Sequence, residues 1–271
     1  MLYFATDISK GRFFPMFRFT YKDIDFSYKL DTANDPADDY TRHMHPFHEI
    51  IYFIGGDVTY TVEDESAKLA GGDFLFIPSG KYHFADINRD KLYERYVLQF
   101  PPSVLPDFLA GKMRDKSPFL GCRKELGPAF SQLDSYFTDY SGMELYTLFL
   151  CELVKILILV SSRTAESRRK SNEILSPIIR YIDENLHEPI TLESLSVRFN
   201  YSKSYISSEF NKQMHISIMR YIRTKKIMAA HNMLLSGKKK GEVAEAFGFR
   251  DYSTFYRAYI SVMGTPPSGQ R

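Results

Sequence analysis

The chain has 271 residues, of which 44% are hydrophobic and 25% charged, and its formal net charge is +2. This composition is ordinary for a globular protein of two modest domains or one large one. The most apolar stretch, residues 145–160, is too short to span a bilayer and contains Glu152 and Lys155, which argues against a membrane protein.

The N-terminus and the cysteines indicate a cytoplasmic protein. The first residues contain no basic stretch followed by an apolar run, so we expect no signal peptide. The two cysteines, Cys122 and Cys151, have no metal-like spacing, and we interpret them as free thiols in a reducing compartment.

The net charge conceals an asymmetry along the chain. Residues 174–271 contain 14 Lys and Arg against 8 Asp and Glu, whereas residues 1–173 contain 21 against 25. A basic C-terminal part behind an acidic N-terminal part suggests that one end meets a polyanion.

Residues 10–100 have the pattern of a β domain. Alternating or apolar runs occur at 17–21, 26–30, 49–54, 58–62, 73–77 and 93–100, with Gly and Pro between several of them. Many short strands at this spacing predict an antiparallel barrel or sandwich.

From about residue 128 the pattern becomes helical. Ser141 and Glu144 have capping-box spacing, and a strongly apolar helix is predicted to follow to about Val160. Such a helix must bury more than one face, against the β domain, a neighbouring helix or a second subunit. We expect the first domain over residues 1–162 with helices at about 128–161, a linker over 163–173, and a second domain over 174–271.

The second domain contains an internal repeat. The run Leu195 to Tyr201 matches Val243 to Phe249, 48 residues later, and each run reaches a turn at Asn200 or Gly248. Asn and Gly are the residues that best tolerate the left-handed backbone conformation of a tight turn. After the turn each copy has an i, i+4 apolar pair: Ile206 with Phe210, and Phe255 with Tyr259.

A helix, a short turn and a second helix that buries an apolar pair form the pattern of a helix-turn-helix. Two copies of this pattern strengthen the assignment. Residues 218–235 are long enough to form one connecting helix. We expect this helix to hold two recognition helices for successive major-groove faces, about 34 Å apart along the duplex.

Residues 174 to about 267 resemble the AraC/XylS family of transcription regulators. The resemblance rests on residues 191–195, 201–206 and 221–223, and most specifically on Val243-Ala244, Gly248 to Phe255 and Gly264-Thr265-Pro266. It implies sequence-specific binding to double-stranded promoter DNA, contact with RNA polymerase and, usually, activation. Two residues depart from the family pattern: His215 stands where glycine is usual after the first recognition helix, and Lys240 where an apolar residue is usual.

Matching positions give the expected DNA contacts. The first recognition helix offers small polar groups and one phosphate-binding lysine, and the second offers an arginine that can read guanine. We therefore expect sequence specificity to depend more on the second unit. The expected DNA-binding residues are Lys203, Ser204, Ser207, Ser208, Tyr252, Ser253, Tyr256 and Arg257.

The N-terminal part resembles the cupin barrels that AraC-type regulators often carry as sensors of a small molecule such as a sugar. His43, His45 and Glu49, with Gly56, resemble the first cupin motif, and His83 lies in the second. In enzymatic cupins, residues at these positions hold a divalent transition metal, which implies His43, His45, Glu49 and His83 as the metal ligands here. The alternative is that they are hydrogen-bonded pocket residues, with no metal cofactor. The candidate ligand contacts are Phe19, His45, Glu49, His83 and Tyr96.

The sequence thus predicts an α+β protein of two domains, an N-terminal antiparallel cupin-like barrel with flanking helices and an all-α double helix-turn-helix domain. We expect a non-enzymatic, ligand-responsive regulator that forms a homodimer through the helices near residues 130–160. A cupin-type metalloenzyme tethered to DNA and a ligand-independent DNA-binding scaffold are the alternatives.

Overall fold

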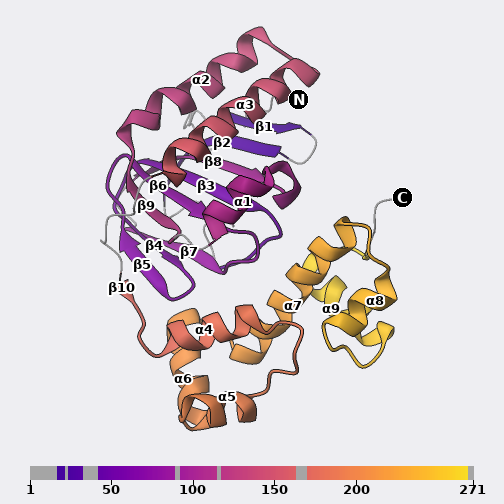
Figure 1. Ribbon diagram of the computed structural model, residues 1–271. Coiled ribbons are helices and arrows are strands. Elements are labelled where there is room, and N and C mark those ends of the chain that lie inside the picture. The colour runs from indigo at the N-terminus through magenta and orange to yellow at the C-terminus, as the bar shows by residue number, and fades with distance from the viewer. Residues whose placement is uncertain are drawn as a thin grey trace, which may run out of the picture. The chain divides into compact units, whose positions relative to one another are not determined.

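The structure is a computed structural model that describes residues 17–21, 24–32, 42–88, 92–114, 117–162 and 170–267. It divides into two compact units, one built mainly from residues before Ser171 and the other mainly from Ser171–Arg271 (Figure 1). Each unit is described by itself below.

Alternating strands form two antiparallel sheets in the N-terminal unit. One sheet has the order β1-β2-β8-β3-β6-β9 and the other β10-β5-β4-β7. The strands are β1 (Phe17–Tyr21), β2 (Ile24–Thr32), β3 (His48–Gly55), β4 (Val58–Val62), β5 (Glu65–Lys68), β6 (Asp73–Ile77), β7 (His83–Ile87), β8 (Leu92–Phe100), β9 (Phe119–Cys122) and β10 (Lys170–Ser171).

The antiparallel β domain is therefore confirmed, but among the described residues its strands form two sheets rather than one closed barrel. The strands predicted at 58–62 and 73–77 have those bounds. The sequence pattern did not reveal β5, β7 or β9.

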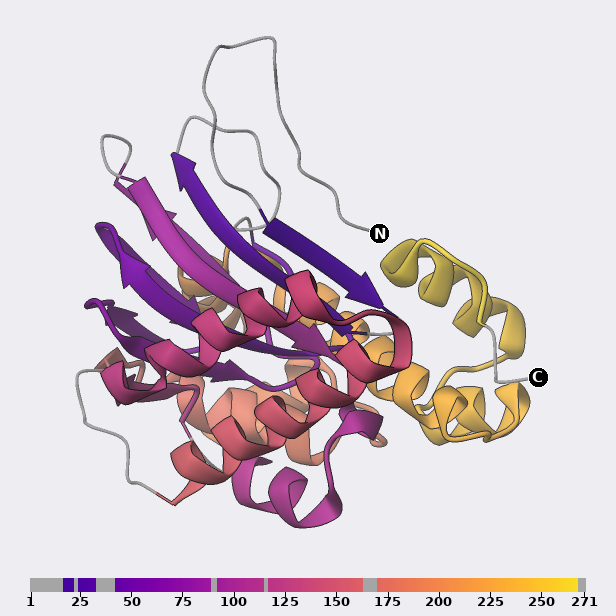
Figure 2. The same cartoon turned by 90° about the horizontal axis from the view of Figure 1, so that it is seen from above.

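Helices cover the outer face of the six-stranded sheet. They are η3 (Pro102–Val104), α1 (Asp107–Arg114), η4 (Lys124–Leu126), α2 (Gly127–Asp139) and α3 (Gly142–Ser161). Figure 2 shows α2 and α3 side by side over this sheet. Phe26, Tyr96 and Leu98 of the sheet share a buried core with Phe130 of α2 and Phe149 of α3. Ser141 is the N-cap of α3 as expected, but it makes no side-chain capping hydrogen bond, so the predicted capping box does not form.

The C-terminal unit is all helical. It contains α4 (Leu175–Glu184), α5 (Leu192–Phe199), α6 (Lys203–Met214), α7 (Ile218–Leu235), α8 (Lys240–Ala246) and α9 (Tyr252–Met263). The predicted connecting helix is confirmed as α7, with α4, α5 and α6 near its first half and α8 and α9 near its second half (Figure 1). None of the described helices of either unit is long and apolar enough to cross a membrane.

Candidate DNA-binding face and effector cavity

Local side-chain chemistry fixes the first helix-turn-helix. Thr191 and Ser194 form a capping box at the start of α5, with 3.0 Å hydrogen bonds in both directions. Asn200 ends α5 at φ +56°, the left-handed turn that the sequence predicted, and Ser202 then caps α6. Ile206 and Phe210 of α6 are fully buried. The turn and the buried pair together set the angle between the two helices.

The second helix-turn-helix repeats this construction. Gly248 takes φ +71° after α8, and Asp251 caps α9 by accepting a 2.7 Å hydrogen bond from the Thr254 amide. Phe255 and Tyr259 are buried against α7 and α8, at the positions that match the apolar pair of the first unit. The sequence repeat is therefore a structural repeat.

Helix α7 holds both helix-turn-helix units. Near its start, the Tyr221 ring lies 5.1 Å from the Phe210 ring of α6. Further along, Ile227 and Leu234 lie in the core that contains α8 and α9. The Lys226 ammonium donates a 2.9 Å hydrogen bond to the Phe247 carbonyl after α8. Desolvation lowers the pKa of Lys226 from its usual value.

His215 keeps the bend after the first recognition helix. It ends α6 at φ +55° and ψ +26°, the left-handed conformation that glycine adopts more readily. The bend is therefore present despite the departure from the family pattern, and the strain of a side chain in this region is accepted at this position.

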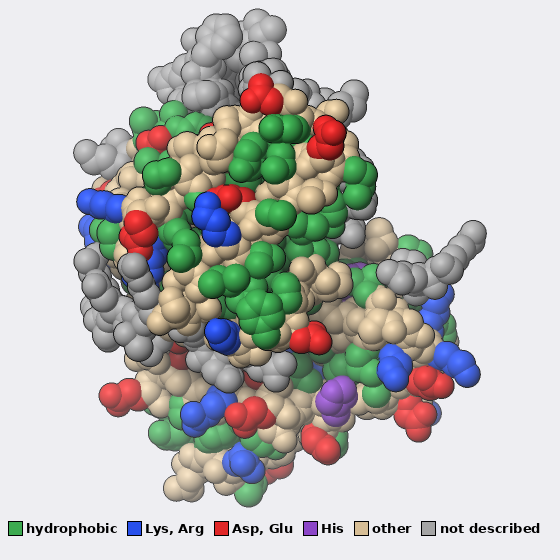
Figure 3. All heavy atoms as spheres, turned by 45° about the horizontal axis from the view of Figure 1, so that its top comes forward, with side chains coloured by type: hydrophobic (Ala, Val, Ile, Leu, Met, Phe, Trp, Pro, Cys, Tyr) green, Lys and Arg blue, Asp and Glu red, His purple; other side chains and the backbone are tan. Residues whose placement is uncertain are grey.

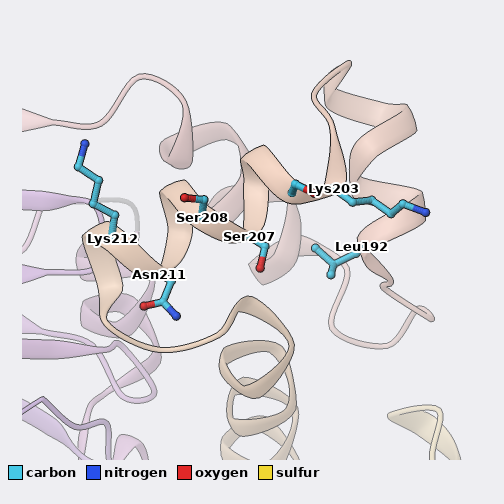
Figure 4. Close-up of a pocket in the computed structure, with 7 residues that line it drawn as sticks. Leu192, Lys203, Ser207, Ser208, Asn211 and Lys212 are labelled. Atoms are coloured by element: carbon cyan, nitrogen blue, oxygen red, sulfur yellow. The ribbon is translucent and has the colours of Figure 1, made fainter.

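The structure leaves the predicted DNA-binding residues accessible. Seven of them are exposed and Ser207 is half-buried: Lys203, Ser204, Ser207 and Ser208 on α6, and Tyr252, Ser253, Tyr256 and Arg257 on α9. A shallow groove of about 690 Å³ follows α6. Figure 4 shows Ser207 and Asn211 pointing to the same side of this helix. Asn211 and Lys212, which also line the groove, were not predicted, although Asn211 follows Ser204 by seven residues and so shares its helix face.

Charges on this face are partly engaged with protein groups. Lys203 Nζ lies 2.5 Å from Glu193 Oε2, so a phosphate contact by this lysine competes with an ion pair. Arg257 lies at hydrogen-bonding distance, 3.4 Å, from the Thr254 hydroxyl. Hydrogen bonds from Thr254, with a smaller contribution from Arg257, hold the pKa of Asp251 below its usual value.

A polar cavity lies inside the N-terminal unit, on the inner face of the six-stranded sheet. Its volume is about 70 Å³, and alternate residues of three strands of this sheet line it: 25, 27 and 29 of β2, 49 and 51 of β3, and 93, 95, 97 and 99 of β8. His43, and Tyr60 of β4, complete the lining. Charged side chains of both signs are among the lining residues, including Asp25, Lys29 and Arg95. The period of two in these strands was the signal that could have identified them.

Among the predicted ligand contacts, Glu49 lines this cavity, whereas His45, His83 and Tyr96 are not among its lining residues. Tyr96 lies on the opposite face of β8, where its hydroxyl donates a 2.8 Å hydrogen bond to Asp134 of α2. Burial, followed by this hydrogen bond, raises the pKa of Tyr96. Phe19 pairs in register with Phe26, but its side chain lies outside the described residues. Tyr96 therefore belongs to the helix-side core rather than to the cavity wall.

The other predicted ligand residues form one cluster. His43, His45, Glu49 and His83 each offer one ligand atom, and these atoms all lie within 4.8 Å of one another. Backbone hydrogen bonds of 3.2 Å and 3.0 Å join His43 and His83, whose rings are 4.3 Å apart. Glu49 comes from the opposite sheet, and its Oε2 is 3.2 Å from Nε2 of His83. The two sheets thus bring together residues 34 positions apart in the chain.

Both units of this chain match known families of protein domains. The AraC-like ligand binding domain matches residues 30–140, and a helix-turn-helix domain matches residues 195–271. The multiple antibiotic resistance protein MarA of Escherichia coli is 32% identical over 107 residues, which cover 39% of this chain and 84% of MarA. The chain belongs to the AraC family of transcriptional regulators.

Two further relatives span both units of this AraC-family regulator. The uncharacterized regulator YobQ of Bacillus subtilis is 26% identical over 84% of this chain and 87% of its own length. The uncharacterized regulator YdiP of Escherichia coli is 24% identical over 88% of this chain and 83% of its own length. The similarity to these two regulators therefore extends along most of the chain rather than over the DNA-binding domain alone.

Proposed function

We propose that this AraC-family regulator binds promoter DNA with both helix-turn-helix units, and that a small effector in the N-terminal cavity controls this binding. The observation that carries the proposal is the structural repeat on α7, in which two capped helices, α6 and α9, each bury one face and expose polar side chains on the other. Any surface helix exposes a polar face, so the repeated helix-turn-helix geometry, rather than polarity alone, distinguishes this unit from a plain helical bundle.

The two recognition helices offer different chemistry to DNA. Ser204 and Ser208 on α6 are short hydroxyl donors and acceptors that any base edge or phosphate can satisfy. Arg257 on α9 has the planar fork that binds guanine O6 and N7 together. We infer that α9 contributes more to sequence discrimination than α6.

The proposed assembly is a homodimer formed through the helical side of the N-terminal unit. Helix α3 leaves Met143, Ile158 and Leu159 exposed, with exposed fractions of 56%, 45% and 48%. Figure 3 shows apolar side chains gathered on this side of the unit. Exposed apolar patches of this kind commonly mark protein interfaces. Two copies would present four helix-turn-helix units to one promoter.

The remaining parts of the proposal follow from the family and the relatives. These relatives are transcriptional regulators, which supports a sensor rather than a cupin-type metalloenzyme in the N-terminal unit. We propose that the protein acts in the cytoplasm and contacts RNA polymerase at activated promoters.

The test is selection of binding sites from random duplex DNA by the full chain, followed by gel-shift titration of the selected site. We expect one recurring sequence, bound at least 10³-fold more tightly than unrelated DNA, in line with the roughly 10³–10⁷ ratio of specific regulators. Enrichment of no sequence, or equal affinity for all duplexes, would contradict the proposal.

A further inference from the structure

Most side chains along the α6 groove cannot tell one base from another. The three serines that line it each end in a single hydroxyl, which satisfies a donor or an acceptor on any base. The ammonium of Lys203 lies against Glu193 and has no acceptor to offer. Adenine is identified in the major groove by a side chain that presents a donor and an acceptor side by side. Among the residues that line the groove, Asn211 is the one whose side chain does so.

The backbone at Asn211 is fixed, although this residue lies in the last turn of α6. Phe210 before it and Met214 after it are fully buried, which anchors the turn in the core. The Asn211 carbonyl accepts a 2.7 Å hydrogen bond from the amide of His215, the left-handed residue that ends the helix. This bond satisfies one of the carbonyls that a helix end otherwise leaves unpaired. Packing and capping therefore hold the Cα of Asn211 in place.

The side chain of Asn211 points along the face that carries two of the serines. Asn211 follows Ser204 by seven positions and Ser207 by four, which are the spacings of a single helix face. Side chains of an α-helix lean toward its N-terminus, so the carboxamide lies over the turn that contains Ser207. Figure 4 shows Ser207 and Asn211 pointing to the same side of α6.

The carboxamide of Asn211 is available to a ligand. It is exposed, and it makes no side-chain hydrogen bond with the residues that the structure describes. Asparagine is shorter than glutamine or arginine, so it reaches a base only where the helix comes close to the groove floor. Short serine side chains leave a groove of about 690 Å³ along α6, which gives the edge of a base pair room for this approach.

The second unit has no equivalent of this group. The buried apolar pairs of the two units are 49 residues apart, so Asn211 corresponds to Ile260 on α9, and Ser208 corresponds to Arg257. The amide of α6 therefore lies three residues, or about 4.5 Å, further along its helix than the arginine of α9. The two recognition helices should then read different bases at different steps of their half-sites.

We propose that Asn211 is a specificity-determining residue that reads one adenine in the major groove bound by α6. Its Nδ2 donates to N7 of adenine, and its Oδ1 accepts from the N6 amino group, which is the paired contact that amide side chains make with this base. The proposal rests on the proposed function, because it takes α6 as a helix that enters the major groove of promoter DNA.

The test is selection of binding sites from random duplex DNA by the full chain, run in parallel with the wild type and with Asn211→Asp. Aspartate has the size of asparagine, but its two carboxylate oxygens only accept, and a carboxylate in the major groove accepts from N4 of cytosine. We expect the wild type to select adenine, and Asn211→Asp to select cytosine, at one position for each bound copy. The other positions should keep their preference. Partial unfolding cannot produce such a gain of preference.

Gel-shift titration of two further variants gives the size of the contact. Asn211→Ala should lose about tenfold in affinity for the selected site, because a paired contact discriminates between bases by roughly 5- to 150-fold. It should also bind all four bases at that position alike. The matched control is Lys212→Ala on the same turn, which removes a charge that suits phosphate and should weaken binding to all sequences by one factor. Thermal unfolding at the wild-type temperature shows that each variant is folded.

The outcomes separate this proposal from the proposed function. A recurring wild-type site whose base preferences are all unchanged in Asn211→Ala and Asn211→Asp would retain the regulator and overturn the adenine contact. An equal loss of affinity for every base in Asn211→Ala, with the preference kept, would assign the residue to phosphate and also overturn it. Failure of the wild type to enrich any sequence would reject the proposed function itself, and the adenine contact with it.

Discussion

At the scale of single residues, Arg257 is the predicted DNA contact best suited to hydrogen-bond to a base edge. It is exposed on α9, where its guanidinium lies 3.4 Å from the Thr254 hydroxyl. The planar fork of an arginine can bind O6 and N7 of guanine together, so this side chain suits base recognition.

Replacing Arg257 with Ala should weaken binding to the selected site by about 1–3 kcal/mol and relax preference at one base pair. The measurement is gel-shift titration on the selected site and on its three single-base variants at each position. The control is Arg180→Ala, which removes one exposed charge from α4 and should leave sequence preference intact. Unchanged affinity and preference in Arg257→Ala would show that α9 reads DNA without this arginine.

At the scale of the helices, α7 and α9 are joined by a polar contact as well as by apolar packing. Nδ1 of His231 on α7 lies 2.5 Å from the Tyr259 hydroxyl on α9, beside the buried Phe255. Desolvation lowers the pKa of His231 from its usual value. The folded state thus favours the neutral ring at the junction that positions the second recognition helix.

Stability of the C-terminal unit should therefore fall in mild acid. Because the folded pKa of His231 is below the unfolded value of about 6.5, its contribution is complete above that pH and is lost as pH falls through the folded pKa. Thermal unfolding between pH 7.5 and 5 measures this. His231→Gln should be less stable at pH 7.5 but lose less stability on acidification. Equal slopes for the two proteins would rule out His231 as the group responsible.

Sequence patterns predicted these elements unequally, for physical reasons. The helix-turn-helix units were predictable because a left-handed turn favours Asn or Gly, found here as Asn200 and Gly248. The pattern also occurs twice in the sequence. The short strand β9 was not, because its four residues pair with β6 through tertiary contacts that no local period records.

Site residues show the same division. The His and Glu cluster was predictable because the motif residues are distinctive, whereas Asp25 and Arg95 are ordinary charged residues until the sheet orders place them at one cavity. Tyr96 looked like a cavity wall because an isolated aromatic residue gives no indication of which face of a strand is the inner one.

At the scale of the whole molecule, self-association would double the number of DNA-reading units. Specific regulators gain affinity when two linked sites engage together, because the second binding event is intramolecular. The exposed apolar residues of α3 are the features of the N-terminal unit that favour such an assembly.

Replacing Leu159 with Glu should convert a dimer into a monomer and weaken DNA binding by at least tenfold. A charge placed in an apolar interface is desolvated without a partner, which the interface does not tolerate. Sedimentation velocity of the full chain measures the change. Gln132→Glu, an exposed position on α2, is the control. If the wild-type chain sediments as a monomer at micromolar concentration, the proposal that α3 forms a dimer interface is wrong.

The measurement closest to the central claim is a hydroxyl-radical footprint of the full chain on its selected site. For each bound copy, the two helix-turn-helix units on α7 should protect two blocks about one helical turn, or roughly 10 base pairs, apart on one side of the duplex. Ser208→Glu should remove the block read by α6 and Arg257→Ala should weaken the other. A single protected block, or two blocks that respond together to either change, would contradict twin recognition helices.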